Sequence, residues 1–170
     1  MKAAGQHISK NLSVNLPTSS VWGVMKDYGN IEHYAPTIKE SVLLNDTIGV
    51  GAKRKVTFHH DGSSLIEEIT DYTEGQGYKM EVTEVSSPVK SMQAKMEIEK
   101  ISNESCKIHM TVQFEVESGV ISWLMGNLLM KPIMQGAITK VITGLAYYAA
   151  TGCKIDTKLP PKQKMLQIIS

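Results

Sequence analysis

Polar and apolar residues alternate with a period of two over much of the chain up to residue 116, as in half-buried β-strands. The first run combines Ile8, Leu12 and Val14 with polar neighbours, although Lys10 interrupts its apolar side. Short breaks separate the later runs, and breaks of this length favour antiparallel hairpins. The pattern predicts strands at residues 8–16, 38–44, 51–59, 63–72, 77–84, 91–101 and 105–116.

Two short helices are predicted after the first strand. Residues 17–28 open with a proline and three hydroxyl residues, which suit a helix start, and continue with apolar residues such as Trp22 at helical spacing. Gly29 suits the left-handed end of this helix. A further helical turn is predicted at residues 31–34, ending before Pro36.

A long helix is predicted from Lys131 or Pro132 to Gly152, because proline is tolerated in a first turn and glycine suits a helix end. Gly136 and Gly144 lower its helix propensity, so we expect the sheet or a ligand to approach closely there. Two adjacent apolar stripes are predicted to face inward: Ile133, Ala137, Val141, Leu145 and Tyr148, and Met130, Met134, Ile138 and Ile142.

One face of the predicted sheet is apolar. Asp61 and Gly62 form a strong turn signal that pairs His60 with Ser63, and this pairing sets which positions of the adjoining strands share a face. The predicted inner face comprises Ala52, Arg54, Val56, Phe58, Leu65, Glu67, Ile69, Asp71, Tyr78, Met80, Val82, Met92, Ala94, Met96, Ile98, Cys106, Ile108, Met110, Val112, Phe114 and Val116. Such a face needs a cover, and the long helix is the only candidate.

Arg54 and Glu67 fall on this inner face on adjacent strands. Because an isolated buried charge is very costly, we expect the two residues to form an ion pair. The pair is either a structural salt bridge beside the core or a polar anchor inside a ligand cavity. A buried pair alone favours the structural interpretation. Inward-facing Met and Gly residues indicate a cavity, although Met more often fills ordinary cores.

Composition narrows the class of protein. Hydrophobic residues make up 42% of the 170 residues, which rules out general disorder, and a net charge of +1 provides no field that attracts nucleic acid. Two cysteines cannot build a disulfide framework or a four-ligand zinc site. The first residues lack a signal-peptide core, and the apolar stretch 120–134 is too short and broken to span a bilayer. These features predict a cytoplasmic protein.

Several segments resemble, in order and spacing, one known superfamily: Val21-Trp22 with Asp27–Asn30, Tyr34–Ser41, Val50–Arg54, Gly62 with Ile66–Ile69, Pro88-Val89 and Gly144-Leu145. This is the START-like, helix-grip superfamily, in its bacterial polyketide cyclase/dehydrase-like (SRPBCC) branch, over about residues 7–150. The resemblance implies an α+β fold, with a curved antiparallel sheet of about seven strands around a long C-terminal helix and a cavity between them. Members bind hydrophobic or amphipathic small molecules, and a minority are cyclases, dehydrases or aromatases.

The function that we predict is binding of a hydrophobic or amphipathic small molecule, such as a lipid or polyketide, in that cavity. The candidate ligand-binding residues are Arg54, Glu67, Phe58, Tyr78, Met80, Met92, Met96, Met110, Phe114, Val141 and Leu145. Loops at Pro36, His60–Gly62 and Ser87–Val89 are candidate rims of the cavity.

Other chemistry has less support, and no catalytic residue is assigned. A shared metal at the adjacent residues His59, His60 and Asp61 is not expected, because neighbouring side chains of a strand point to opposite sides. The alternative is a cyclase- or dehydrase-type enzyme in which Glu67, Asp71 or Tyr78 exchanges protons. A third class is a protein-interaction module built on residues 120–134 and the basic tail.

The organisation that we predict is one domain at residues 1–152 and a loosely held basic tail at residues 153–170. No cofactor, metal or nucleic-acid partner is expected. The predicted partner is a hydrophobic small molecule, the predicted state is a monomer or weak homodimer, and transient membrane contact is left open.

Overall fold

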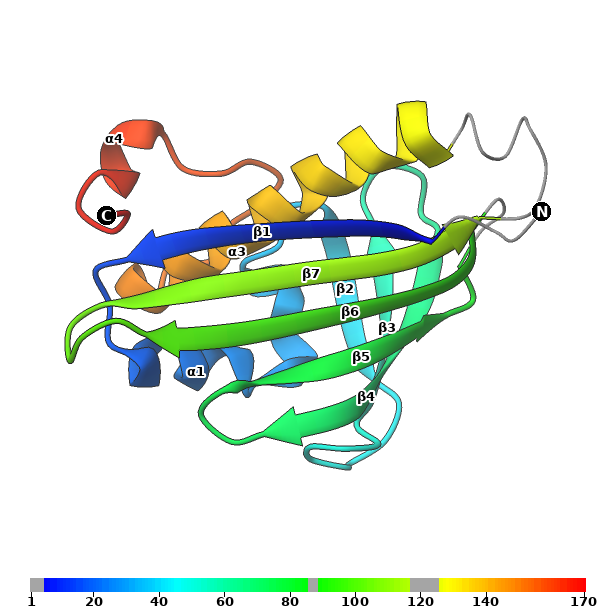
Figure 1. Ribbon diagram of the computed structural model, residues 1–170, viewed down its shortest axis with the longest axis horizontal. Helices are drawn as coiled ribbons and strands as arrows, with labels where there is room; N and C mark the ends of the chain where they lie inside the picture. Colours follow the sequence, from blue (N-terminus) through cyan, green and yellow to red (C-terminus); the bar gives the residue numbers. More distant parts are fainter. Residues whose placement is uncertain (1–4, 86–88, 117–125) are drawn as a thin grey trace.

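A strongly curved antiparallel sheet wraps around one long helix in this computed structural model (Figure 1). The structure describes residues 5–85, 89–116 and 126–170. Seven strands follow the order β1-β7-β6-β5-β4-β3-β2 across the sheet. Their bounds are β1 (Gln6–Val14), β2 (Ile38–Leu43), β3 (Lys53–Phe58), β4 (Ser64–Thr73), β5 (Gly77–Thr83), β6 (Val89–Lys100) and β7 (Cys106–Val116).

The helices cover the concave side of this sheet. The long helix α3 (Lys131–Thr151) follows a π-helical turn, η2 (Gly126–Met130), and ends at Gly152 in the left-handed conformation, with φ of 68°. Two short helices, α1 (Thr18–Met25) and η1 (Tyr28–His33), connect β1 to β2. The predicted α+β architecture, with seven strands, two short helices and a long C-terminal helix, is therefore confirmed.

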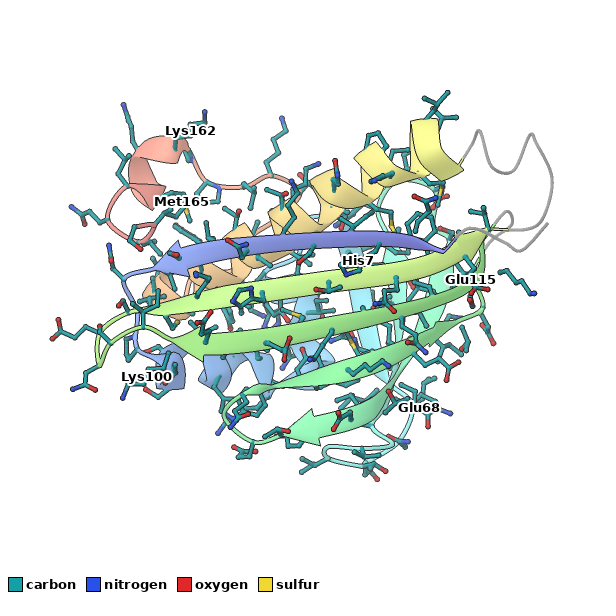
Figure 2. The ribbon with its side chains drawn as sticks, viewed as in Figure 1. His7, Glu68, Lys100, Glu115, Lys162 and Met165 are labelled. Carbon is teal, nitrogen blue, oxygen red and sulfur yellow. The ribbon has the colours of Figure 1, made fainter. Side chains whose placement is uncertain are left out.

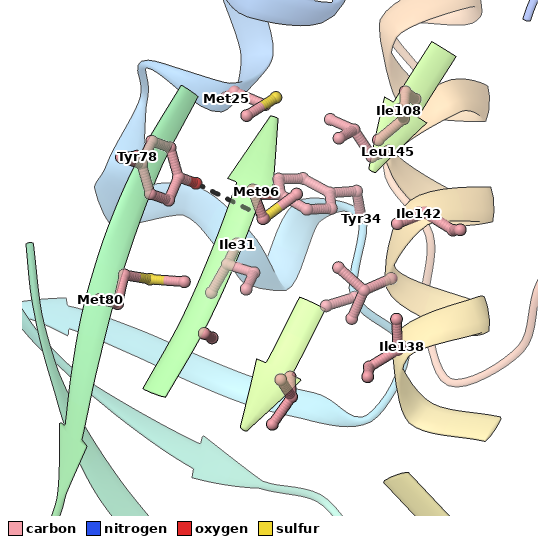
Figure 3. Packing of buried hydrophobic residues seen from close by; sticks show 14 of the residues in the cluster. Met25, Ile31, Tyr34, Tyr78, Met80, Met96, Ile108, Ile138, Ile142 and Leu145 are labelled. Atoms are coloured by element: carbon pink, nitrogen blue, oxygen red, sulfur yellow. Dashed lines mark hydrogen bonds between the residues drawn. The ribbon is translucent and has the colours of Figure 1, made fainter. Parts of the chain in front are cut away.

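The core lies between the inner face of the sheet, the two short helices and α3 (Figure 3). The core residues labelled in Figure 3 are Met25, Ile31, Tyr34, Tyr78, Met80, Met96, Ile108, Ile138, Ile142 and Leu145. Charged side chains such as Glu68, Lys100 and Glu115 lie on the outer side or at strand ends (Figure 2). The predicted alternation thus produces one dry face.

Trp22 fastens α1 to the hairpin between β4 and β5. The indole N–H donates a hydrogen bond of 2.8 Å to Glu74, and the ring packs against Tyr72 with 5.6 Å between centroids. The side chain is 6% exposed, as expected for a residue on the apolar side of α1.

The β3–β4 hairpin has the predicted faces but not the predicted register. Thr57 lies opposite Ser64, and the amide of Phe58 donates to the carbonyl of Ser63, so the chain reverses through a longer loop than an Asp61-Gly62 turn. The predicted pairing is wrong by two positions. Side chains alternate with a period of two, so this shift does not change the face of the residues that pair between β3 and β4.

Asp71 does not share the inner face, contrary to the expectation from the alternation. The pairing of β4 with β5 shifts register between Ile69 and Asp71, as at a β-bulge, and the Asp71 side chain is exposed. Ile133 is also wrongly placed, since it is 64% exposed. The helical period of 3.6 residues carries it well away from the side on which Ile138 and Ile142 are buried.

Gly144 allows α3 to pass close to the chain that follows η1. A Cβ atom at this position would lie 1.9 Å from the carbonyl oxygen of Tyr34, so only glycine fits. A close approach does occur at Gly144, but the neighbour is this connecting segment and not the sheet or a ligand, as was expected. The sheet does not approach Gly136: among the described residues, no atom beyond its chain neighbours and the backbone of α3 lies within 4 Å of an added Cβ.

The C-terminal tail is docked, so the expectation that it is loosely held is wrong. Met165 of the short helix α4 (Lys162–Met165) and Ile168 are buried in the core cluster. The amide of Asn15 donates to the carbonyl of Ile168 at 2.8 Å, and the amide of Ser170 donates to the carbonyl of Ser13. These apolar residues follow the last lysine of the tail, Lys164, and pack into the core, while the tail runs beside the end of β1 (Figure 1). The domain division at residue 152 stays a prediction.

Candidate functional site

Arg54 is the buried polar residue around which the candidate site is built, and its side chain is fully buried at 0% exposure. It lies directly opposite Glu67 in the β3–β4 pairing. Its Nε and Nη2 atoms both contact Oε2 of Glu67, at 2.6 and 2.5 Å. Its Nη1 donates to the carbonyl oxygen of Tyr28, and the guanidinium lies 4.0 Å from the centre of the Tyr28 ring. The predicted ion pair is confirmed.

Two effects oppose each other at Arg54. Burial acts to lower the pKa of the guanidinium, whereas Glu67 and the neighbouring tyrosines raise it, and the net result is a pKa above the ordinary value. Arg54 is therefore a permanent positive charge that Glu67 neutralises.

Three tyrosines surround this pair and are neutral phenols. Burial raises the pKa of Tyr28, Tyr34 and Tyr78 above the ordinary value. The Tyr78 hydroxyl donates to the sulfur of Met96 at 3.7 Å (Figure 3), so its proton is directed into the core.

A cavity of about 340 Å³ lies between the sheet and the N-terminal half of α3. Five of the predicted ligand-binding residues line it: Phe58, Glu67, Met92, Met110 and Val141. The other six, Arg54, Tyr78, Met80, Met96, Phe114 and Leu145, belong to the surrounding buried structure and are not part of the lining. The binding role of all eleven residues stays a prediction, and only the first group lines this cavity.

The predicted binding residues include Val141 of α3 but omit four lining residues from the end of η2 and the first part of α3. Met130, Met134, Ala137 and Ile138 line the cavity, and the helical stripes had already placed them on the inward side. Two methionines at the start of this helix were the available signal, because Met is common at adaptable binding surfaces.

The rim of the cavity is more polar than its interior. Thr37 and Asp61 line it, from two of the three loops predicted as rims. The Asp61 carboxylate accepts hydrogen bonds from the amide and hydroxyl of Ser63, at 2.9 and 2.7 Å, and these bonds lower its pKa. Val89 of the third loop also lines the cavity, whereas Ser87 and Pro88 lie outside the described residues.

In residues 5–85, 89–116 and 126–170, no three His, Cys, Asp or Glu side chains gather as a metal site would require. No helix in those ranges has both the length and the apolar character to cross a membrane. Residues 120–125 of the apolar stretch 120–134, which suggested a protein-interaction surface, lie outside the described residues.

The curved sheet, the long helix and the cavity between them define a helix-grip protein of the START-like (SRPBCC) superfamily. The sequence profile of the family described as "Polyketide cyclase / dehydrase and lipid transport" matches residues 6–150, so the chain belongs to this family. A comparison with curated proteins finds no match.

Solved structures with the same fold share little sequence with this chain. An aromatase/cyclase from Streptomyces is 12% identical with a TM-score of 0.67, and the match covers 89% of this chain and 100% of that one. Norcoclaurine synthase from Thalictrum flavum is 16% identical with a TM-score of 0.64, over 85% and 97% of the two chains. The protein XoxI from Bacillus cereus is 13% identical with a TM-score of 0.70, over 85% and 96%. These likenesses establish the fold.

Proposed function

We propose that the protein binds a hydrophobic or amphipathic small molecule in the cavity between the sheet and α3. The observation that carries the proposal is the cavity itself, which has a mostly apolar lining and few polar groups. Ligand sites in proteins have this character, because apolar walls supply affinity and a few polar groups supply orientation. The family description, which includes lipid transport, supports the same function.

Exposed apolar side chains next to two of the cavity-lining methionines suggest how a ligand enters. Leu128, Leu129 and Ile133 are 64%, 56% and 64% exposed, and Met130 and Met134, which line the cavity, lie between and beside them. A ligand that leaves the cavity along this part of the helix would stay in contact with apolar atoms. We propose transient contact of this surface with a membrane during exchange of the ligand.

The enzymatic alternative depends on Glu67. Asp71 is exposed on the outer side of the sheet, and Tyr78 points its hydroxyl at Met96. Of the three acid–base candidates, only Glu67 lines the cavity. A cyclase- or dehydrase-type reaction would therefore use Glu67, and turnover of a polyketide-like substrate that disappears in Glu67→Gln would replace the binding proposal.

Native mass spectrometry of gently purified protein, together with titration of the neutral fluorescent probe phenylnaphthylamine, tests the binding proposal. We expect saturable binding near one probe per chain. Met110→Trp should abolish this binding by filling the cavity, whereas Gln113→Trp, on the exposed side of the same strand, should leave it unchanged. Equal probe binding by Met110→Trp and wild type, with both proteins folded, would show that this cavity is not the site.

A further inference from the structure

We propose that the cavity selects ligands whose polar end donates a hydrogen bond, as in an alcohol or an amine, over ligands that end in a carboxylate. Glu67 is the acceptor in this interaction. The inference rests on the proposed binding function and adds the chemical class of the ligand.

The first observation is how Glu67 is held. Its side chain is 14% exposed and lines the cavity. Both nitrogens of Arg54 that reach Glu67 converge on Oε2. Within the described residues, no hydrogen bond is made to the other oxygen, Oε1. An ionised carboxylate only accepts hydrogen bonds, so Oε1 offers a fixed acceptor to a donor in the cavity.

The second observation is that the balancing positive charge is out of reach. Arg54 is fully buried and does not line the cavity. Its donors are directed at Glu67, the carbonyl of Tyr28 and, at 3.9 Å, the sulfur of Met80. Arg54 is thus a positioning residue that orients Glu67. An anionic ligand would meet the Glu67 carboxylate without access to the guanidinium.

The third observation is the surroundings of Glu67. Val82 lies directly opposite it on β5 and also lines the cavity, as does Val56 on the neighbouring strand β3. The other carboxylate of the described lining, Asp61, is at the rim and adds negative charge. A hydrogen bond in apolar surroundings is stronger than in water, and placing two like charges together is unfavourable. Both effects favour a donor over an anion.

Three probes with the same apolar chain test the selectivity: octanol, methyl octyl ether and octanoate, with affinity measured by calorimetry at neutral pH. A hydrogen bond to a charged group predicts that wild type binds octanol roughly tenfold or more tightly than the ether. Octanoate should bind more weakly than octanol. The ether controls for the apolar chain, because it lacks a donor.

The double variant Arg54→Met/Glu67→Met removes both charges and keeps apolar volume. We expect its octanol and ether affinities to agree within about twofold and its octanoate affinity to approach them, since the donor preference and the repulsion depend on Glu67. Glu68→Gln is the matched control, because Glu68 is 43% exposed and pairs with Lys53. It should keep the wild-type preferences.

Equal affinity of wild type for octanol and the ether, or tightest binding of octanoate, would overturn the inference and leave the binding function intact. Retention of the octanol preference by the folded double variant would also overturn it. If wild type binds none of the three and does not bind phenylnaphthylamine, the proposed function fails and the inference with it. The comparison of the three affinities in wild type tests the inference even if the double variant does not fold.

Discussion

Two nitrogens of Arg54 contact the same carboxylate oxygen of Glu67, at 2.6 and 2.5 Å. Of the two residues, only Glu67 lines the cavity. The ion pair is confirmed, whereas its role as a ligand anchor stays a prediction. Arg54 belongs to the core, where it holds η1 to the sheet through the Tyr28 carbonyl. Glu67 stands between that core and the cavity.

Removing one partner of the pair should strongly destabilise the fold. Arg54→Met and Glu67→Met each leave a buried or half-buried group without its partner, at a cost of about 3–5 kcal/mol when the remaining charge is buried. The loss should be larger for Glu67→Met, because the charge left behind, Arg54, is fully buried. The double variant should recover much of the loss. Urea denaturation measures all three, and a double variant as unstable as the sum of the singles would contradict this account.

Trp22 is expected to be a major anchor of α1. Trp22→Ala should lower the free energy of unfolding by about 3–5 kcal/mol, because it empties a buried aromatic site. Trp22→Phe keeps most of the packing and loses the hydrogen bond to Glu74, so it should cost less. Chemical denaturation measures both variants. A Trp22→Ala midpoint equal to that of wild type would show that the indole contributes little.

Substitution of two glycines of α3 by alanine should change the stability of the fold in opposite directions. In Gly144→Ala the new methyl group overlaps the Tyr34 carbonyl, and the forced shift should cost about 1–3 kcal/mol. In Gly136→Ala the methyl group enters open space and should stabilise by up to about 1 kcal/mol through helix propensity. Thermal unfolding of the two variants compares them directly. Destabilisation by both would mean that the path of α3 differs from the one described.

Stability should fall at alkaline pH because of the buried tyrosines. Burial raises the pKa of Tyr34 and Tyr78 in the folded state, whereas tyrosines in the unfolded chain keep the ordinary pKa of about 10. Above that pH the unfolded chain releases protons that the folded chain keeps, so the free energy of unfolding decreases by about 1.4 kcal/mol per pH unit for each tyrosine. Below it these groups contribute no pH dependence.

Denaturation at a series of alkaline pH values, with tyrosinate absorbance as a second readout, measures this slope. Tyr78→Phe should remove one tyrosine's share of the slope, while its stability at neutral pH reports the separate loss of the contact with Met96. A slope identical to that of wild type would contradict the contribution of Tyr78.

Particular residues show how far the site could be predicted from sequence. The Arg54–Glu67 pair follows from strand alternation alone, because a register error of two positions does not change the face of a side chain. Which members of the inner face reach the cavity does not follow. Met110 lines it and Met96, also on the inner face, does not, because the curvature of the sheet and the path of α3 decide where space is left.

The sequence by itself determined the order of strands and helices, the dry face of the sheet and the pairing of two charges on it, because these depend on side-chain periodicity and on the cost of isolated buried charge. The tertiary structure alone decided three other features. A bulge places the Asp71 side chain on the outer side of the sheet. Apolar residues around Ile168 hold the tail beside β1, and the Tyr34 carbonyl occupies the space next to Gly144. Each of these depends on contacts between different elements, which the alternation within a single element does not encode.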